Sequence, residues 1–203
     1  MFRSLLLGFI LLGFNIFAHP VIWKGGSVFT LRHLPRMKRV NLHHSLTHRW
    51  ALGFHFADIQ DEKLLFFQNN FLLKRFNKPS SQANIYGFIG LGLAPRFLKD
   101  ENFHLGIQGD WESRRFYTQF NVNSFFYDKI FVSTTFRFGV APYIEDYDGF
   151  HTWIIFQANQ DSFLDDSAMS SSMLVFRFFM QNYLIELGSD FKGLGLMTFM
   201  VHF

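Results

Sequence analysis

Histidine is the residue type in this sequence whose spacing most directly suggests metal chemistry. Five of the nine histidines lie between residues 33 and 55, and neutral imidazole suits copper, zinc or nickel. A hairpin of two strands at 38–46 and 50–57 places His43 and His55 diagonally on one face, within reach of one ion. The alternative is a polar interior in which they hydrogen-bond to neighbours, because two imidazoles fall short of the usual three or four ligands. His43 and His55 are therefore the candidate metal ligands, and no cofactor motif is found.

Charged side chains form a second candidate site. With Ser113-Arg114 as a turn, Glu112 opposes Arg115, and Asp110 lies on the same face. With a turn at 181–182, Arg177 opposes Glu186. Facing charges of this kind set ion selectivity in a pore, or they fill a narrow interior as neutralised pairs. The sequence leaves both interpretations open.

Nucleophilic catalysis is the third chemistry to consider. Ser167 and the run Ser170, Ser171 and Ser172 lie near the outer end of a predicted strand, whereas His151 lies at an inner end. The chain lacks the G-x-S-x-G motif that presents a serine on a sharp turn. We therefore expect no catalytic residue and no enzyme, with a barrel hydrolase as the remote alternative.

The elements that would position these side chains are short strands. Apolar and polar residues alternate in twelve segments bounded by turn residues, which is the pattern of strands with one apolar face. The number is ten if the two weakest segments, the first and the eleventh, do not form. The segments are 27–34, 38–46, 50–57, 63–73, 82–92, 103–112, 115–124, 129–140, 151–158, 171–180, 183–188 and 195–203.

The two ends of the chain indicate where such strands would reside. Residues 1–18 have the pattern of a signal peptide, with Arg3 before an apolar run and Ala18 before the expected cut. The tail alternates apolar residues in steps of two and ends on Phe203. This tail resembles the C-terminal strand of bacterial outer-membrane β-barrels, which the barrel assembly machinery recognises. The sequence thus predicts a signal peptide at 1–18 and an outer-membrane barrel at 19–203.

Composition supports a membrane barrel over a soluble domain. The 203 residues less the 18 of the signal leave 185, and the chain contains 30 phenylalanines with an aromatic share of 20%. A soluble core of that size would not bury so many large apolar groups, whereas a barrel places them on its lipid face. The formal net charge of +3 is scattered, which does not favour nucleic-acid binding.

Three stretches of the sequence resemble a known family. They are Ser81-Gln82-Ala83-Asn84-Ile85-Tyr86, the turn from Asp110 to Arg115, and Ala141-Pro142-Tyr143 with the later His151-Thr152-Trp153. They are similar to an uncharacterised family of small proteobacterial outer-membrane barrels, loosely associated with heavy-metal-resistance gene neighbourhoods. The resemblance implies the fold over nearly the whole mature chain, and it implies no activity or site residue.

Together these features predict an all-β, antiparallel up-and-down barrel of about twelve strands in the outer membrane of a Gram-negative bacterium. The expected function is a narrow channel or an envelope scaffold with a polar, ion-paired lumen. The alternative is a metal-binding outer-membrane protein that uses lumen histidines. The expected partners are outer-membrane lipid, lipopolysaccharide and the barrel assembly machinery.

Overall fold

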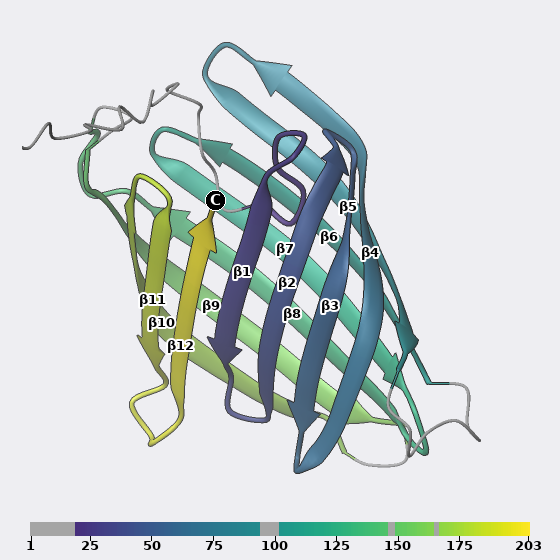
Figure 1. Cartoon of the computed structure of the whole chain (residues 1–203). Coiled ribbons are helices and arrows are strands. Elements are labelled where there is room, and N and C mark those ends of the chain that lie inside the picture. The colour runs from purple at the N-terminus through teal and green to yellow at the C-terminus, as the bar shows by residue number, and fades with distance from the viewer. Residues whose placement is uncertain (1–18, 94–101, 146–148, 165–166) are drawn as a thin grey trace, which may run out of the picture.

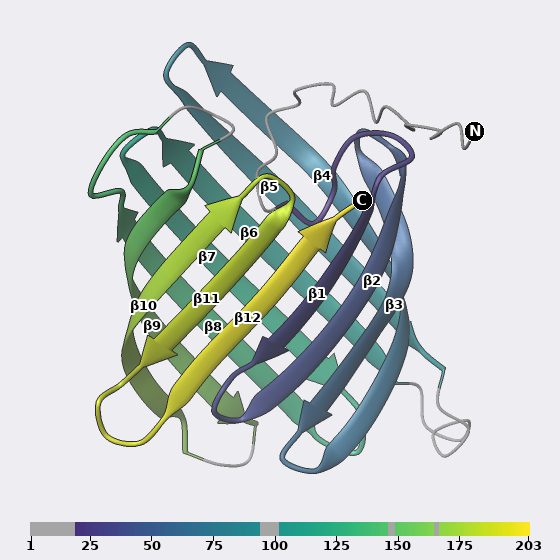
Figure 2. The same cartoon turned by 60° about the vertical axis from the view of Figure 1, so that its left-hand side comes forward.

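The computed structural model describes residues 19–93, 102–145, 149–164 and 167–203, and these residues form one closed antiparallel β-barrel (Figures 1 and 2). The part of the chain that the structure describes has no helix long and apolar enough to cross a membrane. Twelve strands make up the barrel: β1 (Ser27–His33), β2 (Met37–Thr47), β3 (Trp50–Ile59), β4 (Glu62–Lys78), β5 (Ser81–Gly92), β6 (Phe103–Ser113), β7 (Phe116–Phe126), β8 (Ile130–Val140), β9 (His151–Phe163), β10 (Met169–Met180), β11 (Tyr183–Ser189) and β12 (Gly195–His202).

The strands follow one another around the barrel in chain order. Each strand pairs with its sequence neighbours, and β1 pairs with β12 to close the sheet. Backbone hydrogen bonds between Ser27 and Phe203 extend this closing seam. Closure gives every strand of the described barrel a partner on both sides, so most backbone polar groups of the wall are satisfied within the sheet, and residues 74–78 of β4 pair with β5 alone. The fold class and the strand count of twelve are confirmed.

Alternation along each strand separates two chemically different faces. On β7, Tyr117 and Phe125 point inward and are buried, whereas Phe116 and Phe120 point outward with 44% and 48% of their surface exposed. On β3, Ala51 and His55 are buried while Phe54 between them is 50% exposed. The outer surface therefore carries large apolar side chains, which is the reverse of a soluble protein.

The β4–β5 hairpin is longer than the sequence pattern predicts. The predicted connection at 74–81 is mostly strand, and only Pro79-Ser80 forms the turn. A bulge between Leu72 and Lys74 interrupts the alternation, so the inward position passes from Leu72 to Arg75. This hairpin rises above the rest of the barrel at the end where the C-terminus lies (Figure 1).

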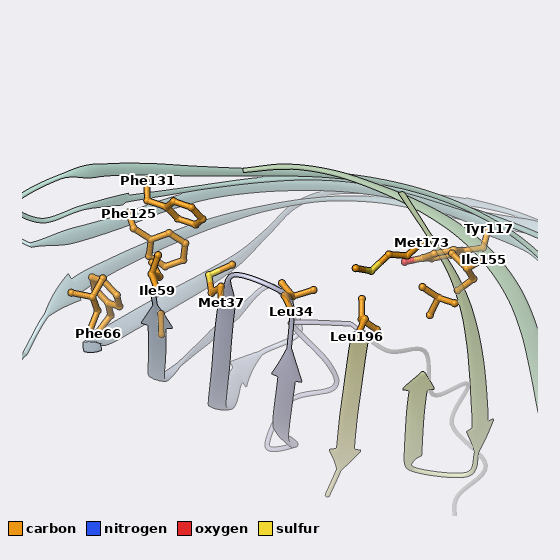
Figure 3. Close-up of a cluster of buried hydrophobic side chains, with 13 residues drawn as sticks. Leu34, Met37, Ile59, Phe66, Tyr117, Phe125, Phe131, Ile155, Met173 and Leu196 are labelled. Carbon is orange, nitrogen blue, oxygen red and sulfur yellow. The ribbon is translucent and has the colours of Figure 1, made fainter. Parts of the chain in front are cut away.

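We call that end of the barrel the terminus end, because β1 begins and β12 finishes there, and we call the opposite end the loop end (Figure 2). A cluster of buried apolar side chains lies inside the barrel, with many of its members at the loop end. Its three phenylalanines, Phe66, Phe125 and Phe131, lie together (Figure 3). The ring centroids are 6.0 Å apart for Phe66 and Phe125 and 6.2 Å apart for Phe125 and Phe131. This apolar cluster limits the polar part of the lumen on the side toward the loop end.

Candidate functional site

The lumen is the candidate functional site, because it gathers the buried polar side chains of the wall. The inward positions of β2 to β7 carry histidine and amide residues, and those of β1, β8, β10 and β11 carry arginine and glutamate. A lone polar group in such an interior is costly, so these groups are expected to pair. Hydrogen bonds and ion pairs join many of these inward side chains to one another.

The segment 19–23 packs inside the barrel near the terminus end. Val21 is fully buried against an apolar group that includes Ala51, Leu72 and Tyr86. The backbone N–H of Ile22 donates to Ser45 Oγ at 3.1 Å. His19 Nε2 lies 3.6 Å from a carboxylate oxygen of Glu112. We name residues 19–23 the N-terminal plug, because both apolar and polar contacts hold them inside the barrel.

A chain of side-chain amides starts at the N-terminal plug and follows the wall. Asn70 Nδ2 donates to the Pro20 carbonyl oxygen at 3.3 Å, and Gln68 Nε2 donates to Asn70 Oδ1 at 2.7 Å. Gln68 Oε1 then lies 2.5 Å from His55 Nδ1 and 2.9 Å from His104 Nδ1. The plug and the lumen histidines thus belong to one hydrogen-bonded network.

The amide chain continues on the far side of His104. His104 Nε2 lies 3.1 Å from Asn123 Oδ1, and Asn123 donates to Asn121. Asn121 donates to Gln108, whose amide nitrogen in turn donates to Asp110 Oδ2 at 3.0 Å. The other oxygen of Asp110 accepts from Asn84 Nδ2 at 2.7 Å. Both carboxylate oxygens of Asp110 therefore accept hydrogen bonds from neutral amides, and among the described residues Asp110 has no ion pair within 4 Å.

A cavity of about 100 Å³, which we call the lumen cavity, lies beside these amides. Its wall contains both predicted metal ligands, His43 and His55, together with Asn41, Arg32 and Arg39. The Nε2 atoms of both histidines are buried and have no hydrogen-bond partner. Within the described ranges, no group of three or more His, Cys, Asp or Glu side chains is arranged to hold a metal ion. The metal site at His43 and His55 therefore stays a prediction.

Space beside His43 depends on a glycine in the facing strand. Gly53 lies opposite His43 in the β2–β3 ladder. A Cβ added at Gly53 would lie 1.9 Å from the backbone oxygen of Leu42, so the two strands approach too closely for any side chain there. This close approach leaves the inner surface beside His43 without a covering side chain.

Glu186 is the centre of the charged part of the lumen. Its side chain is 1% exposed and accepts a hydrogen bond from Arg177 Nε at 2.8 Å. Arg137 Nη2 and Arg32 Nη2 lie 3.0 and 3.7 Å from its carboxylate oxygens. Arg177 also stacks over the Tyr117 ring at 4.3 Å. Three guanidinium groups from β1, β8 and β10 thus surround one carboxylate, as buried charges require partners.

The predicted pair of Glu112 and Arg115 is wrong. The β6–β7 ladder places Glu112 opposite Tyr117 and Asp110 opposite Gln119, two residues away from the predicted register. Arg115 consequently lies exposed in the turn. Ser113 Oγ accepts the backbone N–H groups of Arg115 and Phe116, which favours this wider turn. The Arg177–Glu186 pairing has the predicted register.

The residues considered for hydrolysis are not assembled into a site. In the β9–β10 ladder, His151 lies opposite Phe179 at one end and Ser171 lies opposite Asn159 near the other. Eight strand positions separate the two rungs, and each adds about 3.3 Å. His151 is thus far from Ser170, Ser171 and Ser172, and this arrangement gives no support to nucleophilic catalysis by these side chains.

Several residues of the site carried no usable signal in the sequence. The N-terminal plug precedes the first strand and has no periodic pattern. Arg32 and Arg137 reach Glu186 from strands distant in the chain, and hairpin pairing cannot reveal such contacts. His104 was identifiable as an inward polar residue, although its position next to His55, with ring centroids 4.9 Å apart, depends on the curvature of the wall.

Comparison with known proteins supports the fold. No family model matches the chain, and no curated protein matches it. The barrel is similar to a solved structure described as "KdgM porin", with a TM-score of 0.52, 11% identity, and coverage of 88% of this chain and 98% of that chain. A second similar structure is described as "Unveiling the Mechanism Behind the in-meso Crystallization of Membrane Proteins", with a TM-score of 0.48, 14% identity, and coverage of 88% and 83%. The chain therefore has a porin-like barrel fold.

Proposed function

We propose that this protein is a porin-type channel of the bacterial outer membrane, closed in the present conformation, that favours anions when it opens. The outward apolar side chains fit a lipid surface. The closed barrel also fits a membrane, because only helices and closed barrels satisfy all their own backbone polar groups in lipid. The porin-like fold supports this location and class. The protein is thus a channel, as expected from the sequence, with a preference for anions and a closed resting state.

The excess of arginine over glutamate at the centre of the lumen is the observation that carries the charge preference. Arg32, Arg137 and Arg177 surround Glu186, and Arg39 lines the adjoining lumen cavity. Four guanidinium groups thus lie around or beside Glu186, whereas the other inward carboxylates, Asp110 and Glu112, contact lumen amides and His19 instead. Charged linings at a constriction set selectivity, and a positive excess attracts anions and repels cations.

Buried side chains account for the closed state. Arg137, Asn70 and Thr198 all point inward from different strands and are at most 1% exposed, so water has little access to them. The N-terminal plug covers the terminus end, and the apolar cluster lies toward the loop end. Conduction therefore requires movement of side chains or of the plug, and brief openings of low conductance are expected.

Ion selectivity is the direct test of this function. In a planar bilayer with a potassium chloride gradient, the reversal potential of the purified barrel should indicate chloride preference. Arg39→Gln should reduce the ratio of chloride to potassium permeability about twofold or more, because it removes one of the four positive charges. Lys63→Gln is the matched control, since Lys63 is an exposed cation at the start of β4.

A barrel that prefers potassium, or an Arg39→Gln variant with parental selectivity, would contradict the anion channel. A barrel that stays silent, even with the plug released as described next, would instead favour the envelope scaffold. Both outcomes are separable from misfolding by the shift in gel mobility on heating that folded barrels show.

Release of the N-terminal plug should open the channel. Val21→Asp places a charge in the fully buried apolar site of Val21, which opposes docking of residues 19–23. We expect the open probability in bilayer recordings to rise about tenfold or more, since one buried charge costs well over 1.4 kcal/mol. Lys24→Asp, at an exposed neighbouring position, should leave the open probability unchanged. Equal effects of the two substitutions would show that the plug is not the gate.

A further inference from the structure

Hydrogen-bond geometry fixes which His55 nitrogen carries the proton. The Pro20 carbonyl oxygen only accepts, so the Asn70 atom facing it is the amide nitrogen, and Asn70 Oδ1 accepts from Gln68 Nε2. Gln68 therefore turns its oxygen toward His55, and His55 Nδ1 must be the donor. In the neutral ring this leaves the lone pair on Nε2. The N-terminal plug thus determines, through two amides, that His55 presents an acceptor.

The lumen cavity has polar atoms of both kinds on its wall without partners. His55 Nε2 and Asn41 Oδ1 are acceptors, Arg39 Nε is a donor, and His43 Nε2 accepts or donates according to its tautomer. All four residues line the cavity. A buried group without a partner is destabilising, so this arrangement favours a guest with both donors and acceptors. A chloride ion offers no donor, and an apolar guest offers neither.

Charge limits the guest further. Arg32 and Arg39 line the lumen cavity, and its described lining includes no aspartate or glutamate. Glu186 pairs with Arg32, whereas Arg39 Nε is buried without a hydrogen-bond partner in the same lining as the unpartnered acceptors. The lining thus holds two guanidinium groups and no carboxylate, although Glu186 offsets the charge of Arg32 from outside the cavity, and this balance disfavours a divalent cation and favours an anion. His43 and His55, the candidate metal ligands, therefore line a cavity that suits an anion better than a metal cation.

We infer that the lumen cavity binds a small oxyanion that retains an ionisable O–H, of the hydrogen phosphate class. Its charged oxygens would accept from Arg39, and the O–H of the monohydrogen form would donate to His55 Nε2 or Asn41 Oδ1, whereas the two O–H groups of the dihydrogen form would donate to both. At about 30 Å³ per water, the cavity of about 100 Å³ has room for about three waters or for one such tetrahedral ion. This inference deepens the proposed anion channel by naming its preferred class of solute.

Calorimetry of the intact barrel in detergent micelles, in a phosphate-free buffer at pH 7, tests this site. Sodium phosphate should bind about tenfold or more tightly than sodium sulfate, because sulfate has the same shape but no O–H to satisfy the acceptors. His55→Phe should weaken phosphate binding about tenfold or more, since it removes one acceptor while keeping a ring. His44→Phe is the matched control, because His44 is adjacent to His43 in the chain but points outward.

Equal binding of phosphate and sulfate would overturn the inference, because charge alone would then explain the site. Binding of Zn²⁺ or Cu²⁺ that His43→Ala abolishes, without phosphate binding, would replace it with the metal site. Absence of any binding would leave water as the occupant and also overturn it. The phosphate-to-sulfate ratio is measured on the parent protein, so a variant that fails to fold does not obscure the result. Binding is measured without conduction, so failure of the channel proposal remains distinguishable.

Discussion

Replacing Glu186 with glutamine is expected to lower the free energy of unfolding of the barrel by about 3–5 kcal/mol. The carboxylate is 1% exposed and lies within 4 Å of Arg32, Arg137 and Arg177. A neutral amide would leave three guanidinium groups facing one another without a counter-charge. Breaking a buried charge cluster in this way is more destabilising than replacing it entirely with apolar groups. Urea titration of the barrel refolded in phospholipid vesicles, followed by tryptophan fluorescence, measures the change.

Two further variants make the Glu186 result specific. Glu62→Gln removes an exposed carboxylate at the start of β4 and should change the unfolding free energy by about 0.5 kcal/mol or less. Adding Arg137→Met to Glu186→Gln should recover part of the lost stability, because one uncompensated cation is removed. A Glu186→Gln barrel as stable as the parent would mean that water screens this cluster.

Phe120→Arg is expected to destabilise the barrel in a lipid bilayer by about 2–4 kcal/mol, the range measured for arginine near the bilayer midplane. Phe120 points outward from the central part of β7, between Gly109 and Phe136 on the neighbouring strands, and is 48% exposed. Arginine there places a charge in hydrocarbon. The measurement is the same urea titration in vesicles.

Depth provides the control for Phe120. Phe116 is the first residue of β7, points to the same outer side and is 44% exposed. Phe116→Arg should cost only about 0–1 kcal/mol if this residue lies near the interface. Identical effects of the two substitutions would show that the outer face has no hydrocarbon midplane at Phe120, which would contradict the membrane-spanning assignment.

Alternation in the sequence predicts faces better than it predicts register. The Glu112–Arg115 error is a shift of two residues, which leaves every side chain on its predicted face. Polarity therefore gave no indication of it, and the difference arose from the turn that Ser113 stabilises. In the β2–β3 hairpin, His43 and His55 lie diagonally on one face as predicted, because His43 pairs with Gly53 and Asn41 with His55. Only the turn between the strands 38–46 and 50–57 differs, since Thr47 rather than Leu46 opposes Trp50.

Features that break alternation, or that join distant strands, lay beyond the sequence analysis. The bulge at Leu73 changes which side chains of β4 point inward. The alternation in the sequence therefore stops at residue 73, five residues before β4 ends at Lys78. The cluster at Glu186 was half predicted, because Arg177 is a cross-strand neighbour while Arg32 approaches from a strand far away in the chain. Residues that meet only across a closed barrel have no local periodicity to reveal them.

Docking of the N-terminal plug also dictates an order of assembly. The contacts of Ile22 with Ser45, Pro20 with Asn70, and His19 with Gln82 span 23, 50 and 63 residues of chain. The plug is therefore synthesised before every strand that receives it, and its contacts require that β2, β4 and β5 are in place. Long chain separations of this kind are made late in folding, because the intervening loop must first be closed. We therefore expect the barrel to pass through an intermediate in which β2 to β5 are paired and the plug is not yet docked.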